Sequence, residues 1–160
     1  RFFLEFFAER VLEGEYKIPS FVKQCEDLFR RSQWEHLLNE LSDELGVLGA
    51  LEDRRGGEIY KEGLEDLVDH LNWESPSEVK EVIRDFEELD ERLSSLAALL
   101  EENAITVFVG RRSPITRSPH LSVVAAHYGD GGKSVVLAAI GPKYMDYQKV
   151  IGAFRGLSET

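Results

Sequence analysis

Hydrophobic residues recur at helical spacing through the first 46 residues and predict three helices there. Four phenylalanines among the first seven residues form i,i+4 pairs, which indicates a short amphipathic helix that ends near Gly14. After the helix breaker Pro19, the same spacing predicts a helix over residues 20–31. Ser32-Gln33-Trp34-Glu35 has the S-x-x-E form of a capping box, so a third helix is expected to begin there and to end at Gly46.

The middle of the chain alternates short strands with helices. Residues 47–51 and 58–61 are candidate strands on either side of a charged, glycine-ended turn at residues 53–57, which is typical of a hairpin. Residues 63–71 return to helical spacing. Ser75-Pro76-Ser77-Glu78 combines a serine cap, a proline at the first helical position and a glutamate three residues after the cap, which predicts a long helix from residue 75 to about residue 102.

Three apolar segments near the C-terminus, residues 105–109, 121–128 and 134–140, are predicted to be strands. The last two flank a glycine-rich turn and should pair as an antiparallel hairpin. Both are apolar on consecutive positions, which indicates that both faces of the sheet are covered. A final helix is expected over residues 143–154, started by Pro142. The predicted fold is α+β, with an antiparallel sheet of about five strands covered by helices.

Length and composition limit the classes of protein to consider. A chain of 160 residues can bury a core of its own, and its formal net charge of −11 repels phosphate, which argues against direct binding of nucleic acid or an anionic membrane surface. Cys25 is the one cysteine, so an internal disulfide is excluded. No apolar run approaches the roughly 18 residues of a membrane span. These features suit a cytoplasmic protein.

The charge is divided unevenly along the chain. Residues 1–102 carry 27 acidic and 12 basic residues, whereas residues 103–160 carry 3 acidic and 7 basic ones. Three of these seven cations, Arg111, Arg112 and Arg117, lie in one loop at residues 110–119. That loop is a candidate site for an anion or an acidic partner, and the alternative is an ordinary solvated loop.

No arrangement of residues in the sequence predicts catalysis, a metal site or a cofactor. The four histidines form no H-x-H or H-x-x-x-H pair, and Cys25 lies on the apolar face of a predicted helix, where a small buried hydrophobe is expected. Gly132-Lys133-Ser134 resembles the end of a phosphate-binding loop, but position 127 is histidine and a strand follows, so a hairpin turn is expected. The carboxylates of the long predicted helix, including Asp85, are interpreted as its solvent-exposed (wet) face.

That long helix has a heptad pattern on its apolar side. Its apolar residues follow 3-4 spacing over three heptads: Val79, Val82, Phe86, Leu89, Leu93, Leu96 and Leu100. Such a seam suits either a contact with another chain or packing against the sheet of the same chain. The sequence leaves both open.

A short segment after the last predicted strand resembles a family signature. Gly141-Pro142-Lys143-Tyr144-Met145-Asp146-Tyr147 is similar to the I-G-P-x-R-M-x-Y motif of the heat-inducible transcription repressors of the HrcA family. Its matching site residues are Gly141, Pro142, Met145, Asp146 and Tyr147. Residues 59–64, 105–110 and 121–129 resemble further segments of that family.

The resemblance implies a repressor with an N-terminal winged helix that binds an inverted-repeat operator upstream of chaperone genes, followed by a GAF-like domain. It also implies a dimer and help from the chaperonin GroEL. Longer family members insert a dimerisation segment between early strands, whereas only residues 53–57 separate them here, so this chain resembles compact members that lack it. The expected division is residues 1–46 as helices that lead from a missing winged helix and pack on the core, and residues 47–160 as the GAF-like domain.

The leading hypothesis is therefore a regulatory and dimerisation domain, not an enzyme, from a repressor that negatively regulates chaperone genes. Operator DNA is expected to be read only through the missing winged helix. The candidate dimer interface consists of Phe3, Phe7, Val79, Val82, Phe86, Leu89, Leu93 and Leu96. The alternative is a GAF-like small-molecule sensor, which a polar-lined cavity would favour and a sheet face filled by side chains would not.

Overall fold

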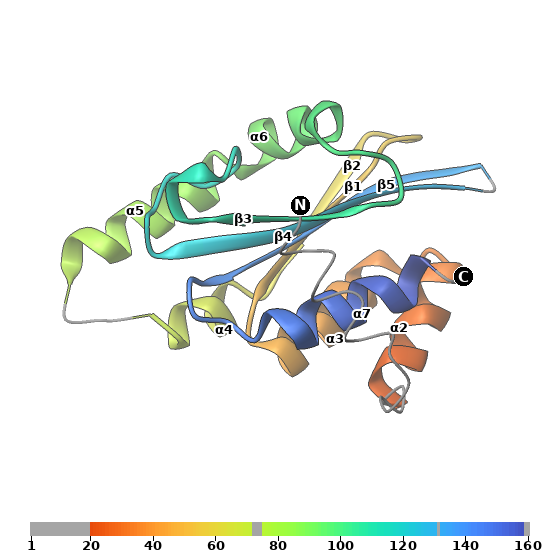
Figure 1. The fold of residues 1–160 in the computed structure, drawn as a ribbon, viewed down its shortest axis with the longest axis horizontal. Helices are drawn as coiled ribbons and strands as arrows, with labels where there is room; N and C mark the ends of the chain where they lie inside the picture. The colour runs from red at the N-terminus through yellow and green to blue at the C-terminus, as the bar shows by residue number, and fades with distance from the viewer. Residues whose placement is uncertain (1–19, 72–74, 131, 159–160) are drawn as a thin grey trace.

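Six α-helices and five strands make up the described part of the chain, residues 20–71, 75–130 and 132–158 of a computed structural model (Figure 1). The helices are α2 (Ser20–Arg30), α3 (Trp34–Leu45), α4 (Leu64–Asp69), α5 (Pro76–Glu87), α6 (Leu89–Leu96) and α7 (Tyr147–Ser158). The strands are β1 (Leu48–Asp53), β2 (Glu58–Glu62), β3 (Ile105–Val109), β4 (Leu121–Asp130) and β5 (Lys133–Pro142). Two 3-10 turns are η1 (Ala97–Leu99) and η2 (Gly110–Arg112). The helix predicted near the N-terminus lies outside the described residues.

The strands form one antiparallel sheet in the order β2-β1-β5-β4-β3. The β4–β5 hairpin is its longest pairing and extends from Leu121 opposite Pro142 to Asp130 opposite Lys133. Both strands are longer than predicted, because the ladder continues through Gly129 to Asp130 opposite Lys133 at the turn, and to Gly141 and Pro142 at the other end of β5. The predicted α+β class with a five-stranded antiparallel sheet is confirmed, and it is consistent with a GAF-like domain.

Helices cover both faces of the sheet, as the apolar strands predicted. Figure 1 shows α5 and α6 along one side of the sheet and α2, α3 and α7 along the other. Alternate residues of β5 enter two separate cores: Leu137 packs with α2, α3 and α7, whereas Ala138 packs with α4, α5 and α6. Successive side chains of a strand point to opposite faces, so β4 and β5 belong to both cores.

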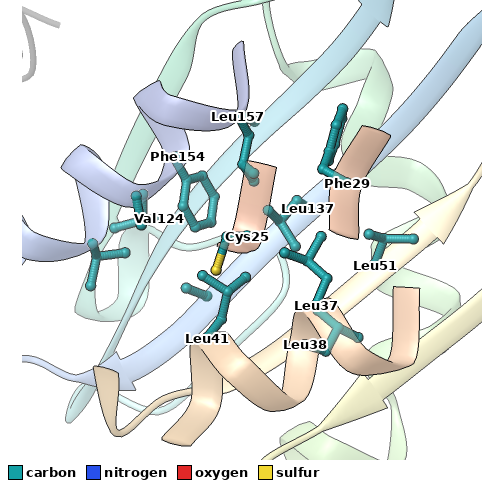
Figure 2. Close-up of a cluster of buried hydrophobic side chains, with 14 of the residues drawn as sticks. Cys25, Phe29, Leu37, Leu38, Leu41, Leu51, Val124, Leu137, Phe154 and Leu157 are labelled. Atoms are coloured by element: carbon teal, nitrogen blue, oxygen red, sulfur yellow. The ribbon is translucent and has the colours of Figure 1, made fainter. Parts of the chain in front are cut away.

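The core on the α2, α3 and α7 side is shown in Figure 2. Cys25 has no exposed surface there, and burial raises the pKa of its thiol to about 12. The prediction of a small buried hydrophobe is confirmed. The Tyr128 hydroxyl donates a hydrogen bond of 2.8 Å to the Phe154 carbonyl, which joins β4 to α7, and burial raises the pKa of this phenol.

The long helix predicted from residue 75 is divided. Ser75 caps it as expected, because its hydroxyl accepts a hydrogen bond from the Glu78 backbone N–H. The helix then breaks at Glu88, which has φ −96° and ψ 2°, and its end tightens into η1. One straight helix over this range would be roughly 40 Å long. The sheet beneath it is shorter and twisted, so the break lets α6 follow the sheet.

Two predicted helix starts are wrong. The final helix begins at Tyr147 instead of residue 143, because Pro142 still pairs in β5 and Asp146 accepts a hydrogen bond from the Lys149 backbone N–H at the helix start. The capping box at residues 32–35 does not form. The residue before α3 is Gln33, which makes no side-chain cap, and Ser32 has a φ of +56°.

Candidate functional site

The family motif and the basic loop meet at one end of the sheet. Strands β2, β3 and β5 finish at this end and β1 and β4 begin there, as their pairing registers show. The Lys143 backbone N–H donates a 2.8 Å hydrogen bond to the His120 carbonyl, which joins the turn after β5 to the start of β4. We call this the motif end of the sheet.

The motif residues build the turn from β5 into α7. A side chain at Gly141 would meet the Met145 sulfur and a Val47 methyl at 3.1 Å, so glycine lets the buried Met145 fold back over the strand end. The Met145 N–H bonds to the Pro142 carbonyl at 2.9 Å, and the Tyr147 hydroxyl bonds to the Lys143 carbonyl. These contacts show how the motif residues pack the turn between β5 and α7.

The basic loop is fastened to α5 and α6 by a buried ion pair. The Asp85 carboxylate accepts hydrogen bonds from the backbone N–H groups of Arg117 at 2.9 Å and Ser118 at 3.1 Å. Arg92 donates to Asp85 at 2.8 Å and to the Ile115 carbonyl at 3.1 Å. Because Asp85 is only 4% exposed, its interpretation as part of the wet face is wrong. Asp85 and Arg92 are seven residues apart, which is about two helical turns. This spacing is the sequence pattern from which their ion pair could have been predicted.

Within the loop, buried and exposed side chains are interleaved. Ile115 and Ser118 are fully buried, whereas the guanidinium groups of Arg111, Arg112 and Arg117 project into solvent. None of the ion pairs among the described residues involves these three arginines. We call residues 110–119 the arginine arch.

The heptad seam faces the sheet of its own chain. Four of its central residues are each at most 1% exposed and belong to the core against β1, β4 and β5: Val82, Leu89, Leu93 and Leu96. Val79 and Phe86 are half-buried beside them. The four buried side chains are therefore covered by their own chain, whereas Val79 and Phe86 keep part of their surface exposed. Phe3 and Phe7 lie outside the described residues.

Two hollows bear on ligand binding. Between α5 and the sheet is an apolar cavity of about 10 Å³, which holds about one water and is far below the roughly 300 Å³ of a small-molecule pocket. A surface cleft of about 360 Å³ lies at the motif end beside β2 and α4. Its lining includes four carboxylates: Asp43, Glu62, Glu65 and Asp66.

We call this hollow the acidic cleft. The pKa of Asp66 is raised, first by desolvation and then by the neighbouring carboxylates of Asp43 and Asp69, which indicates concentrated negative charge. This cleft was not predicted from the sequence. The sequence pattern that could have predicted the cleft is the high proportion of acidic residues at positions 62–69. Asp43, however, contributes to the cleft from a different helix.

Residues 20–71, 75–130 and 132–158 lack two kinds of structural feature. No helix in these ranges is both long enough and apolar enough to cross a membrane. The same ranges contain no group of three His, Cys, Asp or Glu side chains placed to hold a metal ion.

Comparison with known proteins gives consistent matches. Residues 12–151 match the family model described as the HrcA protein C terminal domain. The chain is 32% identical over 94 residues to the heat-inducible transcription repressor HrcA of Anaeromyxobacter sp. (strain K), covering 58% of this chain and 27% of that protein. It is 31% identical over 136 residues to the HrcA of Sorangium cellulosum (strain So ce56), and this match covers 80% of this chain and 39% of that protein.

The chain therefore spans well under half the length of these relatives. Among solved structures, the crystal structure of a hypothetical protein matches this chain with 23% sequence identity and a TM-score of 0.44. The match covers 63% of this chain and 32% of the other chain.

Proposed function

This chain belongs to the HrcA family, and from that membership we propose that it is the regulatory and dimerisation domain of a heat-inducible transcription repressor that negatively regulates chaperone genes. The observation that carries the proposal is the match of residues 12–151 to the C-terminal domain of that family. The relatives that match the chain are named as repressors of this kind.

In the proposed repressor, an N-terminal winged helix binds operator DNA. Dimerisation through this domain holds the two winged helices at the spacing of the operator half-sites. The net charge of −11 supports this division, because the domain by itself repels phosphate. The proposal also includes cytoplasmic location, assistance by the chaperonin GroEL and a role without catalysis. The filled sheet faces favour this role over a small-molecule sensor.

Two measurements test the proposal. Sedimentation equilibrium of the chain should give a dimer, and a gel-shift assay should show no retardation of an inverted-repeat operator by the chain alone. The complete repressor should retard that operator. Deletion of residues 20–158 from the complete repressor should weaken its binding to the operator by at least about a hundredfold, because each winged helix then binds one half-site independently.

Two outcomes would contradict the proposal. One is a chain that remains monomeric at several hundred micromolar. The other is a deletion that leaves the affinity for the complete operator unchanged.

A further inference from the structure

Opposite charges occupy the two edges of the motif end. The arginine arch follows β3, at one edge of the sheet, and the acidic cleft lies beside β2, at the other edge. Four strand spacings separate the two edges, which is roughly 19 Å. Both patches therefore fit within one interface of ordinary size.

Within the described residues, the three arginines of the arch make no ion pair. Exposed Lys143 and His120 adjoin the arch through their backbone hydrogen bond. The carboxylates of Glu78 and Asp85 on α5 are buried; Glu78 lies 4.0 Å from His120, and Asp85 is already occupied by Arg92 and the arch backbone. The arginine side chains are therefore presented on a fixed backbone, and their charge is free to act on another molecule.

The carboxylates of the acidic cleft also lack ion-pair partners within the described residues, although His70 partly offsets the raised pKa of Asp66. Of the described residues that line the cleft, Lys61 alone carries an ammonium group, and this group is 2.7 Å from Asp90, with which it forms an ion pair. No ion pair within the described ranges includes Asp43, Glu62, Glu65 or Asp66. The cleft therefore offers negative charge of the same order as the positive charge of the arch.

An exposed aromatic ring lies between the two edges. Tyr144, in the turn after the central strand β5, is 76% exposed, and its hydroxyl bonds to the His70 carbonyl just after α4. The bond fixes the phenol while leaving its ring open to solvent. Rigid exposed aromatic residues inside a polar rim are characteristic of protein interfaces.

We propose that the motif end of the sheet binds a second copy of this chain about a two-fold axis near Tyr144, so that the arginine arch of each copy lies on the acidic cleft of the other. This inference rests on the dimer in the proposed function and assigns the surface that forms it. A two-fold axis brings the same patch of both copies together, so the patch must be complementary to itself. Positive and negative areas on opposite sides of a centre satisfy that requirement.

A nucleic acid is a less suitable occupant of the same face. DNA lying on the arch would extend along the motif end and bring its phosphates toward the acidic cleft, which would repel them. A second copy instead neutralises both patches. Because these charges are solvent-exposed, salt should screen the contact, and the dimer should weaken as ionic strength rises.

The proposal is tested by reversing each patch and then mixing the two variants. One variant carries Arg112→Glu and Arg117→Glu, and the other carries Asp43→Lys and Glu65→Lys. Sedimentation equilibrium at 50 mM salt should show a dimer Kd at least about tenfold weaker for each variant alone. The equimolar mixture should form a 1:1 heterodimer with affinity near that of the original chain, because both contacts are again between opposite charges. Recovery in the mixture also shows that both variants are folded.

A matched control carries Arg31→Glu and Arg55→Glu, which make the same change of charge at the other end of the sheet, beyond α2 and in the β1–β2 turn. It should dimerise like the original chain. Unchanged dimerisation of the arch variant, or failure of the mixture to associate, would overturn the proposed surface while leaving the dimer itself in place. A monomeric original chain would instead contradict the proposed function. If the arch variant stays dimeric but the complete repressor loses operator affinity with a shallower salt dependence, the arch contacts DNA and the proposed surface is rejected.

Discussion

Asp85 is the side chain through which α5 positions the arginine arch. Its carboxylate accepts hydrogen bonds from two backbone N–H groups of the arch and from Arg92. An ionised carboxylate removed from water needs such donors, and Arg92 in turn needs the carboxylate. Each partner therefore makes the burial of the other tolerable, and together they determine where Arg112 and Arg117 project.

Replacing Asp85 with alanine should lower the free energy of unfolding by about 3–5 kcal/mol, because two backbone N–H groups of the arch lose their acceptor and Arg92, whose side chain is 12% exposed, keeps only Glu88 and the Ile115 carbonyl as partners. Asp90→Ala is the matched control. It removes a half-exposed carboxylate paired with Lys61 and should cost about 0–1 kcal/mol. Urea denaturation measures both changes. Equal effects of the two substitutions would show that the buried ion pair has no special role.

At the scale of elements, α5 and α6 act as a cover for one face of the sheet. The heptad spacing brings Leu89, Leu93 and Leu96 onto β1, β4 and β5, and the exposed carboxylates lie on the opposite side of the helices. A heptad pattern is usual for contacts between helices, but it also suits a helix that lies on a sheet. Burial inside the chain identifies the second arrangement here.

Leu93→Ala should therefore reduce stability without changing the oligomeric state. Truncation of this fully buried leucine is expected to cost about 2–5 kcal/mol. Leu99, in the following 3-10 turn, is 62% exposed, so Leu99→Ala should change stability by less than about 0.5 kcal/mol. Thermal unfolding and sedimentation of both variants check this. A Leu93→Ala chain of unchanged stability that becomes monomeric would show that the seam is an interface after all.

At the scale of the whole molecule, the two cores depend on the same two central strands. Leu137 and Ala138 are neighbours in β5, yet they pack into cores on opposite faces. Loss of one helical layer would expose the apolar face of β4 and β5 to water. The two layers are therefore expected to unfold together, in one cooperative transition.

Trp34 allows this to be measured, because it lies in the core opposite Leu93. In a Trp73→Phe background, Trp34 fluorescence reports on the α2, α3 and α7 layer alone. Leu93→Ala should move the urea midpoints of Trp34 fluorescence and of far-ultraviolet circular dichroism by the same amount. A shift in circular dichroism that leaves the Trp34 midpoint unchanged would show that the layers unfold separately.

Most of the elements, and the covering of both faces of the sheet, follow from local patterns in the sequence. Runs of apolar residues in β4 and β5 predicted burial on both faces, and Ser75 and Cys25 were assigned correctly from local pattern. The family motif was also recognisable from one short segment. These features depend on spacing between residues that are close in the chain, which is the information that a sequence displays directly.

Tertiary structure alone decided the break at Glu88, the burial of Asp85 and the formation of the acidic cleft. The helix break follows from the twist of a sheet formed by distant strands. Asp85 is buried because residues 117 and 118 return to it from more than thirty positions away. The cleft joins Asp43 of α3 to Asp66 of α4 across the sheet edge. In each case the free energy comes from contacts between segments far apart in the chain, so no local pattern displays it.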